Sequence, residues 1–103
     1  MAQPFSISDE VRREALVKAA AVRRERAELR AQLKAGDVAL SDLLGRVDDD
    51  TVGKMKVLAV LESLPGVGKV KARKAMERIG ISDSRRLRGL GSRQRGQLLQ
   101  DFG

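Results

Sequence analysis

The sequence predicts an all-α protein of one domain, with a long N-terminal helix over residues 1–36 and a compact helical body over residues 37–103. The chain has 103 residues, which fits one domain near the lower limit for a self-sufficient core. Residues 8–34 are rich in Ala, Arg, Glu and Leu and lack Gly and Pro, a composition typical of an uninterrupted helix. Further along, two helix-forming segments flank a Pro- and Gly-containing turn at about residues 55–79, which indicates a helix-hairpin-helix unit.

The first helix is expected to run from about Ser8 to Lys34. Ser8 suits an N-cap, and Gly36 supplies a stop signal. At 1.5 Å per residue the helix would be about 40 Å long, more than a small core can cover. Its apolar stripe is narrow and consists of Ala15, Ala19, Val22, Leu29 and Leu33. We therefore expect its N-terminal part to project from the body.

Basic side chains on this helix share one face, because their spacing is three and four residues; they are Arg23, Arg26, Arg30 and Lys34. One interpretation is a solvated face whose arginines pair locally with Glu25 and Glu28. The other interpretation is a phosphate-binding patch formed by Arg23, Arg26 and Arg30, in addition to the motifs described below; on DNA such a patch could bridge two duplexes.

Shorter elements are expected in the rest of the chain. A short helix is predicted at about Ser41–Arg46, and the acidic loop at residues 48–51 is expected to cap the next short element. Ser92 is a candidate N-cap for a last helix that ends near Phe102.

The charge distribution indicates an anionic partner. The formal net charge is +7 and the isoelectric point is about 10.6. Residues 1–50 hold 9 Lys and Arg against 10 Asp and Glu, a net charge of −1, whereas residues 51–103 hold 12 against 4, a net charge of +8. Because the excess lies among apolar residues that look folded, it favours a nucleic-acid surface over a basic tail.

Composition excludes several other functions. Cys and His are absent, which removes disulfides, thiolate chemistry, His-based metal sites and the usual general base. Aromatic residues amount to 2% and consist of Phe5 and Phe102, too few for a flipped-base pocket or for stacking on single strands. We therefore expect that the protein is not an enzyme and has no cofactor.

No apolar run approaches the ~18 residues of a membrane span and no secretory signal is evident, so we expect a cytoplasmic protein without a membrane partner.

The segment between Met55 and Met76 carries the strongest motif, MKVLAVLESLPGVGKVKARKAM. A helix from about Lys56 to Leu64 is followed by the turn Pro65–Gly68, and a second helix runs from about Lys69 to Ile79. The residues expected to contact DNA here are Gly66, Val67, Gly68, Lys69 and Lys71.

Each turn residue has a physical role. Gly66 permits a turn that a Cβ would hinder, and Val67 places an apolar side chain between the two helices. Gly68 leaves room for a phosphate to approach backbone N–H groups at the start of the second helix, where Lys69 and Lys71 add positive charge. An ordinary corner between packed helices is the alternative, although it needs neither the second Gly nor the lysines. Hairpins of this kind often hold a monovalent cation on loop carbonyls, and side chains do not decide whether this one does.

A second basic motif contains Arg85, Arg86 and Arg88, three arginines in four positions next to Leu87 and Leu90. The pattern favours a short ordered element whose arginines contact phosphates or a narrow minor groove. The alternative is a solvated run of charge.

Three segments together resemble the actinobacterial integration host factor family: residues 53–57, the hairpin at residues 64–70, and residues 85–91. The resemblance implies a nucleoid-associated protein that binds double-stranded DNA with little sequence preference and bends or compacts it. It also implies roles in transcription, chromosome organisation and site-specific phage recombination, with a phage integrase as partner, and a monomer in solution. The family's helix-two-turn-helix body is similar to that of a small-subunit ribosomal protein, which leaves RNA binding as the alternative. Residues 36–50 are the part of the chain that the resemblance matches least, and their role is not assigned.

Overall fold

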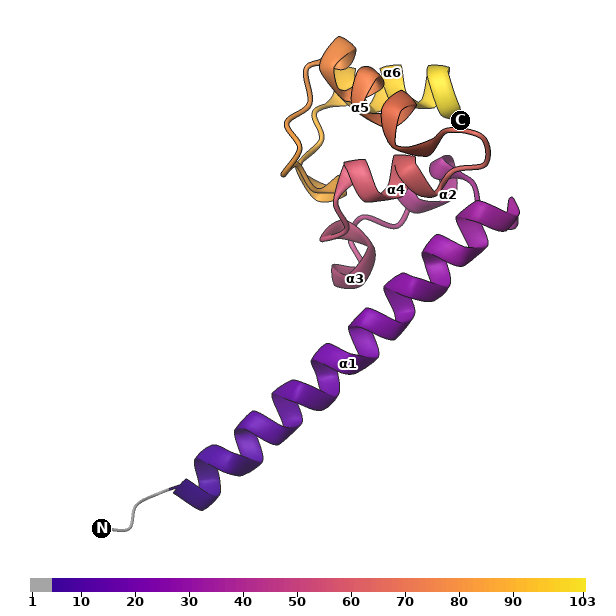
Figure 1. Ribbon diagram of the computed structural model, residues 1–103. Helices are drawn as coiled ribbons and strands as arrows, with labels where there is room; N and C mark the ends of the chain where they lie inside the picture. The colour runs from indigo at the N-terminus through magenta and orange to yellow at the C-terminus, as the bar shows by residue number, and fades with distance from the viewer. Residues whose placement is uncertain (1–4) are drawn as a thin grey trace.

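The computed structural model describes residues 5–103, and α1, which spans Phe5–Ala35, projects well beyond the helical body (Figure 1). The described chain measures 59 × 27 × 24 Å. Side chains from Asp9 to Lys18 are all exposed, whereas Leu29 and Leu33 near the end of the helix are buried. The narrow apolar stripe therefore anchors only the C-terminal third of α1, as predicted.

The two ends of α1 compare differently with the prediction. The helix begins at Phe5, so Ser8 lies inside it, and the prediction of Ser8 as an N-cap is wrong. No Gly or Pro separates Phe5 from Ser8, so nothing in this stretch prevents an earlier start. The other end is as predicted: α1 stops at Ala35, and Gly36 follows with a left-handed φ of 82°.

The body consists of five further helices and one 3-10 turn. In chain order these are α2 (Leu40–Leu44), α3 (Asp50–Gly53), α4 (Val57–Ser63), α5 (Gly68–Ile79), η1 (Leu87–Gly89) and α6 (Ser92–Phe102). The acidic loop caps α3 as expected, because Asp49 accepts hydrogen bonds from the N–H groups of Thr51 and Val52 at 2.8 and 3.3 Å. Both predicted helices of the hairpin are present within about one residue of the expected ends.

The N-cap of α6 differs from the prediction, because the cap residue is Gly91 rather than Ser92. Gln94 takes over the capping role: its Oε1 accepts from Gly91 N–H at 3.1 Å, and its Nε2 donates to the carbonyl of Gly80 at 3.2 Å. The side-chain amide of Gln94 thus connects the start of α6 to the end of α5.

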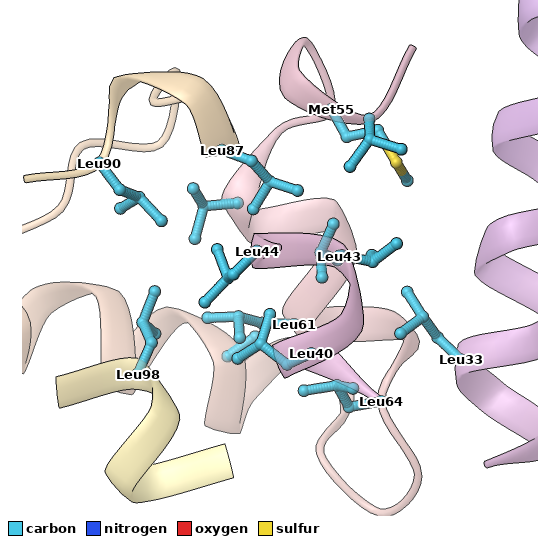
Figure 2. Close-up of a cluster of buried hydrophobic side chains, with 14 of the residues drawn as sticks. Leu33, Leu40, Leu43, Leu44, Met55, Leu61, Leu64, Leu87, Leu90 and Leu98 are labelled. Atoms are coloured by element: carbon cyan, nitrogen blue, oxygen red, sulfur yellow. The ribbon is translucent and has the colours of Figure 1, made fainter. Parts of the chain in front are cut away.

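The core lies where all of these elements converge, and leucine dominates it (Figure 2). Leu33 of α1, Leu61 of α4 and Leu98 of α6 are fully buried. So is Leu87, which secures η1. Ala72 of α5 is also fully buried, and this small side chain allows α5 to approach α4 closely. The core thereby holds the hairpin and η1 in one rigid body.

Candidate nucleic-acid interface

The hairpin consists of α4, residues 64–67 and α5. Gly66 and Gly68 have left-handed φ values of 74° and 69°, and no heavy atom lies within 4 Å of where a Cβ on either residue would sit. Glycine is therefore required by the backbone conformation, and the space beside it is open. Val67 is half-buried against the core, in the anchoring position that the sequence predicts.

The start of α5 offers uncompensated hydrogen-bond donors. No side chain caps this helix at Val67, so the first N–H groups of α5 have no side-chain partner. Lys69 and Lys71 on the first turn are exposed and make no ion pair among residues 9–103. An open groove of about 740 Å³ runs along the hairpin and also touches Lys34 of α1 and Glu62 of α4. Donors, a positive helix end and lysines therefore converge at a surface open to an anion.

The arginine-rich segment is an ordered turn, in which Arg86 and Arg88 remain exposed. Arg85 Nη1 donates to the carbonyl of Gly89 at 2.7 Å, and Arg86 Nη1 donates to the carbonyl of Lys54. Both contacts leave other guanidinium N–H groups unused, because arginine carries five.

Arg88 is held by α3 and the loop before it. Its Nη2 lies 2.7 Å from Asp50 Oδ1, and its Nε lies 3.4 Å from the carbonyl of Val47. The guanidinium packs on Gly53: a Cβ there would lie 2.9 Å from Arg88 Nε and 2.3 Å from the carbonyl oxygen of Val47. The hydrogen bond and charge of Arg88, followed by the charge of Lys54, lower the pKa of Asp50 below its ordinary value. Of the three predicted arginines, Arg88 is the one already paired with a carboxylate.

The backbone attaches this turn to the start of α4. An antiparallel bridge pairs Lys56 with Arg86. Its two hydrogen bonds run from Val57 N–H to the carbonyl of Arg85 at 3.0 Å and from Leu87 N–H to the carbonyl of Met55 at 2.9 Å. Arg86 is therefore fixed relative to Lys54 and Lys56, and the turn and the hairpin lie at opposite ends of α4.

The three arginines of the predicted face on α1 differ in their surroundings. Arg26 and Arg30 line a cleft of about 310 Å³ between α1 and the start of α4, whereas Arg23 is exposed outside it. The predicted pairing with Glu25 and Glu28 is absent among residues 9–103, whereas Arg23 and Arg30 are exposed, as a solvated face requires. These glutamates lie on α1 beside the arginines in sequence, but neither lines the cleft.

Lys54 and Lys56 also line this cleft, together with Met55, Ala59 and Arg86. The sequence analysis did not single out either lysine as a site residue. Both lysines lie in residues 53–57, one of the three segments that carry the family resemblance, and that is the signal that could have singled them out.

Other kinds of site find little support in the part of the chain that the structure describes. No group of three or more Asp and Glu side chains there is placed to hold a metal ion. None of the helices in that part is both long enough and apolar enough to cross a membrane.

Comparison with known proteins agrees with this geometry. Residues 33–102 match the family model described as the S13-like H2TH domain, which covers the hairpin, the arginine turn and the body. The chain is 54% identical to the integration host factor of Streptomyces coelicolor over 94% of this chain and 92% of that protein. It is 55% identical to the integration host factor of Mycobacterium tuberculosis over 100% of this chain and 98% of that protein. The chain belongs to the actinobacterial integration host factor family.

A solved structure supports membership in the integration host factor family at the level of the fold. The structure of sIHF bound to an 8-bp palindromic DNA superimposes with a TM-score of 0.80 at 56% identity, covering 84% of this chain and 98% of that one. The predicted resemblance and the all-α class, with its helix-two-turn-helix body, are confirmed.

Proposed function

We propose that this chain is a nucleoid-associated protein that binds double-stranded DNA through the sugar-phosphate backbone, with little sequence preference. The observation that carries the proposal is the hairpin, where an uncapped helix N-terminus and two glycines border an open groove, and two exposed lysines follow on the first turn of the helix. Phosphate contacts of this kind position a protein on a duplex without reading bases. The DNA-bound sIHF structure, in a relative of the same fold, supports this assignment.

The DNA-contacting residues that we propose are those of the hairpin and the arginine turn. Gly66, Val67 and Gly68 present the backbone of the hairpin, and Lys69 and Lys71 add charge. At the other end of α4, Arg85 and Arg86 use their remaining N–H groups for phosphates, and Arg88 extends the same positive surface. Because one rigid body carries both anchors, a duplex that engages both must follow the protein surface. This supports DNA bending and compaction as the outcome of binding.

The names of the relatives support a wider role for this chain. As an integration host factor it would act as a monomer in the cytoplasm, at the nucleoid, and would support chromosome organisation, transcription and site-specific phage recombination beside a phage integrase. No catalytic step is part of this proposal, because the described residues offer positively charged and amide donors rather than a nucleophile with a base.

One observation favours a second candidate, since the matching family model is described as S13-like. A helix-two-turn-helix body could use the same donors on the phosphates of structured RNA. Base and sugar contacts distinguish RNA from DNA, whereas phosphate contacts alone do not.

Competition binding tests the proposed function. A fluorescent 30-base-pair duplex would be displaced by unlabelled duplexes of unrelated sequence or by a structured RNA hairpin at equal salt. We expect unrelated duplexes to compete within a few-fold of one another and the RNA to compete more weakly. If RNA displaces the probe at lower concentration than any duplex, the ribosome-like alternative replaces the proposal.

A further inference from the structure

The cleft between α1 and the start of α4 is lined by residues that are far apart in sequence. Two arginines come from α1, two lysines from the segment before α4, and one arginine from the turn before η1. These cleft cations are Arg26, Arg30, Lys54, Lys56 and Arg86. The volume of about 310 Å³ is at the lower end of small-ligand sites, and Met55 and Ala59 contribute its apolar part.

Backbone carbonyls position two of these cations. Arg86 donates to the carbonyl of Lys54, and Arg26 Nε lies 3.4 Å from the carbonyl of Thr51. Thr51 lies in α3, and Lys54 directly follows that helix. Carbonyl partners orient a guanidinium without neutralising its charge, so both arginines remain fully cationic.

No acidic side chain lines the cleft, and none of its five cations forms an ion pair among residues 9–103. Asp50 is a carboxylate that interacts with the charge of Lys54, and it is already paired with Arg88, whose Nη2 lies 2.7 Å from Asp50 Oδ1. Five like charges around one small cleft repel one another, and a bound anion would relieve that repulsion.

We propose that this cleft binds a backbone phosphate of the same duplex that the hairpin binds. Arg26 and Arg30 then belong to the primary DNA surface rather than to a separate surface for a second duplex. The inference rests on the proposed function, because its ligand is the phosphate of duplex DNA.

Continuity along α1 supports one surface. Arg26, Arg30 and Lys34 are four residues apart on one face, and Lys34 lies at the groove of the hairpin. The row is about 12 Å long, which corresponds to about three or four phosphates on one strand at 3.4 Å of axis each. The face thus connects the cleft at one end of α4 with the hairpin at the other.

The test is a double-mutant cycle on a single short duplex at 1:1 stoichiometry, with Arg30→Ala, Lys54→Ala and the double variant. Both side chains are exposed and unpaired within residues 9–103, so the fold should be unaffected, which thermal unfolding would verify. Each single change should weaken binding about three- to tenfold and reduce the salt slope by about one. The double variant should lose less than the product of the two single effects, because both side chains serve the same phosphate.

Arg13→Ala is the matched control, since it removes the same charge from the exposed part of α1 and should change affinity far less. Arg30→Lys should restore much of the lost affinity, because it keeps the charge. The proposal is overturned if Arg30→Ala leaves 1:1 affinity and the salt slope unchanged. If that variant instead reduces the joining of two differently labelled duplexes, α1 forms the separate bridging surface. A wild-type chain that fails to bind any duplex would overturn the proposed function itself.

Discussion

Arg88 Nη2 lies 2.7 Å from Asp50 Oδ1, and this ion pair joins the arginine turn to α3 across 38 residues of sequence. Gly53 makes the approach possible, because the guanidinium occupies the place where a larger residue would put its Cβ. The pair itself is exposed, with 46% of the Arg88 side chain and 77% of the Asp50 side chain accessible. Exposed pairs stabilise proteins weakly, so its main effect is to orient the turn and to neutralise a carboxylate near Lys54.

Replacing Gly53 with Ala should destabilise the fold. The new Cβ would lie 2.3 Å from the carbonyl oxygen of Val47, so backbone must move as well as Arg88. We expect a loss of about 1–3 kcal/mol in the free energy of unfolding, measured by urea denaturation. Gly96→Ala is the control, because Gly96 lies inside α6 with nothing within 4 Å and should gain about 0.5–1 kcal/mol. Equal effects of the two substitutions would contradict this account of Gly53.

The contribution of the Asp50–Arg88 pair should depend on pH. The pKa of Asp50 is lower in the folded chain than in the unfolded chain, chiefly because Arg88 donates a hydrogen bond to it. The pair therefore stabilises the fold at neutral pH and loses that contribution as the pH falls through the folded pKa. Asp50→Asn should be slightly less stable than the wild type at pH 7 and indistinguishable from it at strongly acidic pH. A difference that is constant across pH would show that the carboxylate charge is not involved.

Two leucines on α1 should differ strongly in the effect of truncation to alanine. Leu33 is fully buried against the body, whereas Leu16 is 61% exposed on the projecting part. Leu33→Ala should cost about 2–5 kcal/mol of unfolding free energy through lost burial and a cavity. Leu16→Ala should stay within about 0.5 kcal/mol of the wild type. Urea unfolding followed by circular dichroism would measure both, and a large effect at Leu16 would mean that the exposed part of α1 is packed in solution.

The hairpin was predictable because its chemistry is local. Gly66, Gly68 and Gly80 stand where the backbone requires a positive φ, and Ala72 stands where two helices must approach closely. Such requirements are visible in a few consecutive residues. The helix ends were less predictable: Gly91 caps α6 because Gln94 reaches back to it, and the second bond of Gln94, to the carbonyl of Gly80, joins residues 14 positions apart.

The cleft was not predictable, because its members come from three separate segments. Their spacing in the sequence placed Arg26 and Arg30 on one face of α1, but it did not show which residues of the body lie next to that face. The structure brings Lys54 to that face, 24 residues after Arg30, through the packing of α1 on α4. The same limit applied to Arg88, whose partner Asp50 is the first residue of α3 and lies in a stretch that the sequence predicted only as a helix-capping loop.

The salt dependence of duplex binding by the wild type and by the double variant Lys69→Ala/Lys71→Ala tests the central claim most directly. If three to six phosphates are neutralised, the wild type should give a log–log slope of roughly −3 to −5. The double variant should flatten that slope by about two on any sequence, whereas the charge-matched control Arg13→Ala/Lys18→Ala should leave it nearly unchanged. A hairpin variant with the wild-type slope, or a control with the same loss, would contradict backbone binding through the hairpin.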